Sequence, residues 1–248
     1  MKTNGMQRFP KRSWLTTAFA LVSILAAPRL VSADDMLEQR LFSLFMIDRL
    51  EYRWQQGANT VDWNVQAWIG GDYHRFWFKT NGAKLPDGKV KDAEAQFLYS
   101  RLIAPFWDMQ VGLRYDDKPR PSRSYAVVGL KGLAPYWFEV DAAAFLSEQG
   151  DISARLEAEH DVLLTQRLVL QPRFETNLAV QKVKELGIGQ GVNNVEVELR
   201  LRYELRREFA PYVGVSWRRE LGATAGMARG AGQDVEDSAV LAGIRAWF

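Results

Sequence analysis

The chain contains no cysteine, so disulfide bonds play no part in holding its fold together. After residue 33 it also lacks any apolar run near the roughly 18 residues that a membrane-spanning helix requires. Helical insertion into a membrane is therefore excluded. Insertion as a β-barrel stays open, because barrel strands only alternate apolar and polar residues, and aromatic residues make up 12% of the chain.

Histidine is also scarce, with His74 and His160 as the two occurrences. A histidine-activated serine nucleophile needs a histidine beside the serine and an orienting polar group, and no such set is marked here. We therefore expect no enzymatic activity. Metal ligation has little support either, since there is no histidine pair and no thioether cluster, and Met36 and Met46 are only weak candidate ligands.

The first 33 residues have the pattern of a secretory signal peptide. A basic start precedes an apolar run at residues 14–27 and a small-residue exit, Val31-Ser32-Ala33. The run is too short for a bilayer of ~30 Å, although an N-terminal anchor is the alternative. Cleavage would leave 27 basic and 30 acidic residues from the 32 and 30 of the whole chain. The mature chain is then mildly acidic, which argues against a nucleic-acid partner.

The most informative segment is residues 195–206, where apolar and charged residues alternate throughout. A strand places the apolar side chains on one face and the charged ones on the other. On a helix the same charges would surround the axis and leave no apolar stripe. Such a strand belongs either to a solvent-washed antiparallel sheet or to a transmembrane barrel with lipid outside and a polar lumen inside.

The alternation recurs along the chain and predicts about twelve strands, an even number, as in single-chain outer-membrane barrels. The expected strands cover approximately residues 49–54, 61–69, 73–79, 94–103, 107–116, 124–133, 136–146, 151–161, 168–181, 195–206, 211–220 and 238–248. Short links are expected at 70–72, 104–106, 133–135 and 208–211, and longer ones at 80–93, 117–123, 182–192 and 221–237. A soluble sandwich has no reason for such alternating link lengths.

Two further patterns favour the barrel. An Ala-Pro-aromatic motif recurs at residues 104–106, 134–136 and 210–212, where proline suits a turn and the aromatic ring suits a girdle at the lipid boundary. Ordinary corners of a soluble sheet are the alternative. The last strand alternates back from a terminal Phe248, with Arg245 on the opposite face. We predict an all-β fold, an antiparallel outer-membrane barrel at residues 45–248, after a signal peptide (1–33) and a short periplasmic segment (34–44).

The charged faces of these strands form the candidate functional surface. If they share the lumen, opposite charges on neighbouring strands can pair across the ladder. Such a network either fills and rigidifies a small barrel or provides a selective path for cations. Its predicted members are Glu139, Asp141, Arg155, Glu157, Glu159, Arg173, Glu175, Glu196, Glu198, Arg200, Arg202, Arg218 and Arg245.

Several stretches resemble the copper resistance protein B family of outer-membrane proteins. They include Ile-Asp-Arg-Leu-Glu-Tyr-Arg at residues 47–53, Gly-Gly-Asp-Tyr at 70–73, and the block that begins at 206–215 and runs on to Trp247-Phe248. The resemblance extends from about residue 44 to 248. It implies a role in copper tolerance at the outer membrane, by export or sequestration of copper ions, beside a periplasmic multicopper oxidase.

One departure from that family concerns the segment ahead of the barrel. Many relatives carry a Met- and His-rich segment there, whereas residues 34–45 of this chain contain one methionine and no histidine. Any copper role must therefore rest on the barrel or on partners. A general small-solute or cation channel of the outer membrane is the alternative function.

Overall fold

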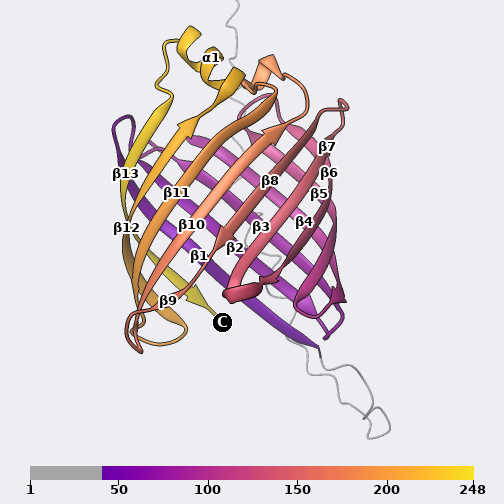
Figure 1. The fold of residues 1–248 in the computed structure, drawn as a ribbon, viewed down its shortest axis with the longest axis vertical. Helices are drawn as coiled ribbons and strands as arrows, with labels where there is room; N and C mark the ends of the chain where they lie inside the picture. The colour runs from indigo at the N-terminus through magenta and orange to yellow at the C-terminus, as the bar shows by residue number, and fades with distance from the viewer. Residues whose placement is uncertain (1–40) are drawn as a thin grey trace, which may run out of the picture. The chain divides into compact units, whose positions relative to one another are not determined.

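The computed structural model describes residues 41–248, which form one antiparallel sheet closed into a barrel (Figure 1). Strands that follow one another in the chain pair, except that β8 pairs with β10, and the pairing of β1 with β13 closes the barrel. The predicted all-β fold with about twelve strands is confirmed. The predicted signal peptide, Met36 and most of the segment at 34–44 lie outside the described residues.

The strands have the following bounds. They are β1 (Phe42–Gln55), β2 (Thr60–Gly70), β3 (His74–Lys84), β4 (Val90–Ala104), β5 (Trp107–Lys118), β6 (Arg123–Ala134), β7 (Phe138–Ser147), β8 (Ile152–Glu159), β9 (Val162–Leu163), β10 (Leu168–Ala179), β11 (Gly191–Tyr203), β12 (Phe209–Glu220) and β13 (Glu236–Trp247). The two-residue β9 pairs with β10 beyond the end of β8, so β8 and β9 together occupy one position in the wall.

Burial alternates along β11 as the sequence pattern predicts. Glu196, Glu198, Arg200 and Arg202 are buried, whereas the apolar residues between them are 36–43% exposed on the outer surface. Because a strand sends successive side chains to opposite faces, the charged set must point into the lumen and the apolar set outward. The ladder at residues 195–206 therefore has an apolar outer face and an ionic inner face, although the strand itself ends at Tyr203.

The connections lie at two ends of the barrel. The end of β13 and the links at 71–73, 105–106 and 204–208 lie at one end, and α1 (Gly222–Gly230) lies at the other (Figure 1). The link predicted at 221–237 thus contains a helix that the sequence pattern missed. No helix of the described chain is long and apolar enough to cross a membrane.

The long link predicted at residues 80–93 is wrong. β3 continues to Lys84 and β4 begins at Val90, which leaves five residues between them. Gly82 interrupts the alternation of β3. The indole of Trp63 occupies the space beside it, because a Cβ at this position would lie 2.4 Å from that ring. A glycine inside a strand often marks such a close approach.

The Ala-Pro-aromatic motif has a different setting at each of its three positions. Pro105 lies in the two-residue turn before β5, and Pro135 begins the short 3₁₀ helix η1 (Pro135–Trp137). The third proline, Pro211, lies within β12 and pairs with Ile244 of β13, because the preceding turn is already complete at residue 208. Phe106 and Tyr136, beside the first two prolines, are 67% and 84% exposed at the rim.

Candidate functional site

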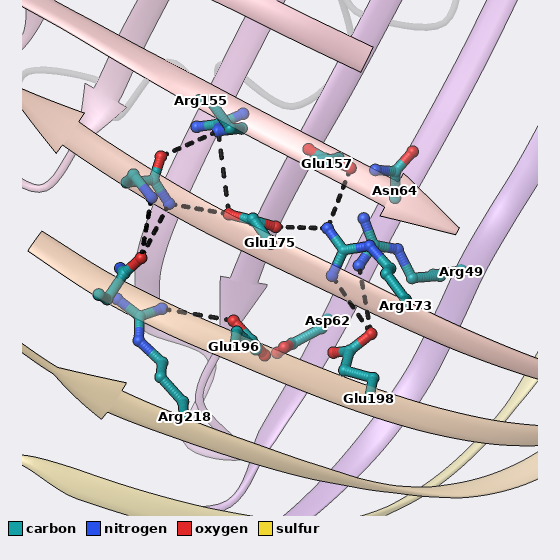
Figure 2. Close-up of polar contacts among 12 residues, drawn as sticks. Arg49, Asp62, Asn64, Arg155, Glu157, Arg173, Glu175, Glu196, Glu198 and Arg218 are labelled. Carbon is teal, nitrogen blue, oxygen red and sulfur yellow. Dashed lines mark hydrogen bonds and ion pairs between the residues drawn. The ribbon is translucent and has the colours of Figure 1, made fainter. Parts of the chain in front are cut away.

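The centre of the lumen is built around Glu198 on β11. Its side chain is fully buried and accepts hydrogen bonds from Arg200 at 2.5 Å, from Arg173 at 3.2 Å and from Arg53 at 3.4 Å. Figure 2 shows Glu198 on its strand with Arg173 reaching it from β10. Removing a carboxylate from water costs free energy unless charge-assisted hydrogen bonds compensate for the lost hydration. Three guanidinium groups supply such hydrogen bonds to Glu198.

Arg173 joins three carboxylates in this region. One nitrogen contacts Glu157 at 3.0 Å and also Glu175, while the other contacts Glu198 (Figure 2). Arg173 lies on β10, between β8 and β11 in the wall, and is 4% exposed. Its planar fork carries five donors in a fixed geometry, so it can bind carboxylates on two sides at once.

Several ion pairs cross the lumen instead of joining neighbouring strands. Arg53 of β1 contacts Glu196 of β11 at 2.9 Å, although β12 and β13 separate these strands in the wall. Arg155 of β8 contacts Glu94 of β4 at 2.9 Å, and three strands lie between them. Side chains from opposite walls therefore meet inside the barrel and fill its interior.

The sequence analysis missed the contribution of β1 to this network. A β-bulge shifts the register between Ile47 and Arg49, and a bulge lets consecutive residues share a face. Asp48 contacts Arg245 at 3.0 Å and Arg49 at 3.7 Å, so both neighbours on the bulge face the lumen. The alternation around Arg49, Glu51 and Arg53 was visible in the sequence, but the bulge was not.

Glu51 of β1 is held by side chains from β11 and β12, on the far side of β13. The hydroxyl of Tyr212 donates to it at 2.7 Å, and Arg200 lies 3.4 Å away. A Cβ on Gly243 would lie 2.7 Å from that hydroxyl, so the missing side chain leaves the space in which Tyr212 and Glu51 meet.

A second part of the lumen is apolar. Leu98, Tyr125, Val127 and Phe145 form a buried cluster on β4, β6 and β7. The guanidinium group of Arg114 covers it, 4.5 Å from the ring centre of Phe145 and 5.1 Å from that of Tyr125. Cation–π contact lets this arginine join the apolar cluster to Glu94, which it contacts at 2.8 Å.

The remaining predicted residues lie toward the rims. Arg202 pairs with Asp161 at 2.6 Å, and Arg218 pairs with Glu220 at 3.0 Å on its own strand. Glu139 and Glu159 lie directly opposite each other on β7 and β8, and neither forms an ion pair with any described residue. The expected pairing of opposite charges on neighbouring strands is therefore found for Arg173 and Glu198, which lie opposite each other. It is not found for Glu139 and Glu159, because the register places these two like charges opposite each other.

Comparison with known proteins identifies the family. The model of the family described as "Copper resistance protein B precursor (CopB)" matches residues 41–248. This chain belongs to the copper resistance protein B family. It is 44% identical over 205 residues to "Copper resistance protein B" of Escherichia coli, covering 83% of this chain and 69% of that protein. It is 38% identical over 217 residues to the "Copper resistance protein B homolog" of Pseudomonas syringae pv. tomato, covering 88% and 74%.

A solved structure with the same fold is the NanC porin, with a TM-score of 0.54 at 10% identity. The match covers 82% of this chain and 98% of the porin. At this identity the likeness concerns the fold alone. Family membership and the porin-like barrel together support a copper resistance role at the outer membrane.

In the described part of this copper resistance protein B family member, Met46, Met109, His74 and His160 have separate surroundings. The sulfur of Met46 lies 3.6 Å from a guanidinium nitrogen of Arg245, and Met109 is 38% exposed on the outer face. His74 contacts the hydroxyl of Tyr99 at 2.5 Å, and His160 stacks on a rim phenylalanine. Within residues 41–248 no group of three or more His, Cys, Asp or Glu residues could hold a metal ion.

Proposed function

We propose that this protein serves copper resistance as a narrow, cation-preferring passage for copper ions across the outer membrane. The observation that carries the proposal is the set of ion pairs that cross the lumen, such as Arg53 with Glu196 and Arg155 with Glu94. They fill the interior with charged side chains from opposite walls. A barrel filled in this way suits the passage of a small ion and opposes the free diffusion of larger solutes.

The charges at one rim support cation entry. Glu139 and Glu159 face each other near the end of the barrel that holds the chain's C-terminus, and neither is neutralised by a described ion-pair partner. Unpaired carboxylates at an entrance raise the local concentration of cations. We place this end in the periplasm, as expected for an outer-membrane barrel with short periplasmic turns.

Growth in graded copper tests the role itself. We expect deletion of the gene to lower the tolerated copper concentration and the wild-type gene to restore it. Tolerance that is unchanged by deletion would contradict a copper role.

Conductance tests the passage against the alternative of a general solute channel. The purified barrel in planar bilayers should show small, cation-selective currents. Large currents with little ion preference, together with uptake of neutral sugars into vesicles, would instead support the general channel.

A periplasmic multicopper oxidase is the partner that the family resemblance implies, and it belongs to the same proposal. Chemical crosslinking in intact cells, followed by isolation of this protein, should recover the oxidase. Its recovery should depend on the periplasmic turns, such as residues 204–208.

A further inference from the structure

Four carboxylates stand directly opposite one another on four successive strands. The register pairs Asp141 of β7 with Glu157 of β8, Glu157 with Glu175 of β10, and Glu175 with Glu196 of β11. We call these four residues the carboxylate row. Like charges in directly opposed positions, with Cβ atoms about 4.5–5.5 Å apart, destabilise a sheet. A row of four such carboxylates is therefore unfavourable for the fold and indicates a functional role.

Cationic side chains from outside the row hold it together. Lys79 contacts Asp141 at 2.8 Å from across the lumen, and Arg173 contacts Glu157 at 3.0 Å. At the far end Arg53 contacts Glu196 at 2.9 Å. In Figure 2 Glu157, Glu175 and Glu196 follow one another across three strands, with the arginines reaching in from the sides.

The carboxylate row changes its depth along the barrel axis from one strand to the next. Cross-strand neighbours lie perpendicular to the strands, and barrel strands are tilted by roughly 35–45° from the membrane normal. Asp141 lies three residues from the start of β7, at the end that holds the C-terminus. Glu196 lies five residues from the start of β11, which begins at the opposite end. The row therefore leads from one side of the membrane toward the other.

A cavity lies beside the first two carboxylates of the row. It has a volume of about 40 Å³ and is lined in part by Gln66, Gln110, Asp141 and Glu157. Gln110 is 2% exposed, yet its amide nitrogen has no hydrogen-bond partner, and neither has the amide oxygen of Gln66. An unmet donor and an unmet acceptor around a space large enough for water indicate that water molecules occupy this part of the lumen.

We propose that the carboxylate row and this cavity form the path of a hydrated divalent cation, Cu²⁺, through the barrel. The inference rests on the proposed passage of copper and adds its route and the oxidation state of the ion. Of the two oxidation states of copper, Cu²⁺ accepts oxygen ligands such as carboxylates and water, whereas Cu⁺ prefers thioethers and thiolates. On the lumen side Met46 lies against the positive charge of Arg245, which disfavours a cation there.

A hydrated ion held through its own water molecules needs no converging group of ligands, which agrees with the lack of one in residues 41–248. The ion displaces Lys79 from Asp141, and then Arg173 and Arg53 from the later carboxylates. These cationic side chains occupy the row when no ion passes. They therefore limit leakage of other ions.

Ion flux into vesicles tests the path. The mature full-length chain is inserted into phosphatidylcholine vesicles that contain a copper-quenched dye, and CuCl₂ is added outside. We expect Glu157→Gln and Glu175→Gln together to lower the rate of Cu²⁺ entry at least tenfold. The matched control is Asp116→Asn, a lumen carboxylate outside the row that pairs with Arg114 at 2.7 Å. It should change the rate less than twofold.

Two further measurements separate the path from a structural role. A row that only stabilises the barrel would shift the unfolding midpoint of the variants without changing the flux through those molecules that stay folded. If the double variant does not fold, Glu157→Gln alone is used, because its partner Arg173 keeps two other carboxylates. Copper kept as Cu⁺ by ascorbate should enter no faster than in protein-free vesicles.

The outcomes distinguish this inference from the proposed function. A wild-type barrel that passes no copper in either oxidation state would overturn both. A wild-type barrel that passes copper while the row variants pass it equally fast would overturn the path alone. Entry of Cu⁺ at the rate of Cu²⁺, or an equal loss in Asp116→Asn, would also overturn it.

Discussion

The lumen has two differently built regions that are equally buried. Arg173 and Glu198 in the charged region are 4% and 1% exposed, and Leu98 and Phe145 in the apolar cluster are each 3% exposed. The charged region depends on partners, because removing one charge leaves others buried and unpaired. The apolar cluster depends on packing, because removing one side chain leaves a cavity. Equal burial therefore conceals two different sources of stability.

Arg173→Met should break the charged region most severely. The substitution leaves Glu157, Glu175 and Glu198 short of a partner, so we expect a loss of about 3–5 kcal/mol in the free energy of unfolding. Denaturant unfolding of the barrel in lipid vesicles, followed by tryptophan fluorescence, measures it. Arg173→Lys is the control and should lose less. A loss below about 1 kcal/mol for Arg173→Met would mean that water in the lumen solvates these carboxylates.

Phe145→Ala should weaken the apolar cluster by a smaller amount. The expected loss is about 3 kcal/mol, at the lower end for such a truncation, because Arg114 can move into part of the space. Leu146→Ala is a matched control on the same strand, since Leu146 is 49% exposed on the outer face, where lipid refills the space. The same unfolding measurement applies. Equal losses in the two variants would contradict a packed cluster inside the lumen.

Arg200→Leu and Arg202→Leu sharpen the comparison within one strand. Arg200 contacts Glu198 and Glu51, both at most 1% exposed, so we expect a loss of roughly 2–3 kcal/mol. Arg202 contacts Asp161, which is 42% exposed, so the loss should be about 0–1 kcal/mol. Thermal migration shifts on gels rank the two variants. Similar shifts would show that the depth of the pair in the lumen does not decide its contribution.

The alternation of residues predicted a large part of this structure. It identified the strands, their approximate number and the inner face of β11, because a period of two follows from the geometry of any strand. It treated Arg200 and Arg202 alike, since both stand on the same face two residues apart. Their partners come from β1 and from the link after β8, and nothing local in residues 195–206 identifies those segments.

Other elements escaped prediction for separate reasons. The predicted link at 80–93 begins too early, because Gly82 lies inside β3, where the indole of Trp63 on the neighbouring strand leaves no room for a Cβ. The bulge at Asp48 follows from a register shift between β1 and both of its neighbours. Both features depend on contacts between strands, and a pattern along one strand does not contain them.

The sequence by itself determined that the strands have one apolar and one charged face, since that division needs only the alternation along each strand, and the link lengths and the terminal Phe248 favoured a barrel. The family resemblance, which the comparisons confirm, also lies in the sequence. Tertiary structure alone decided which charges meet. Closing the sheet brings β1 within reach of β11, and the register aligns Asp141, Glu157, Glu175 and Glu196 into one row. Pairing across a lumen depends on closure and register, which are properties of the whole barrel.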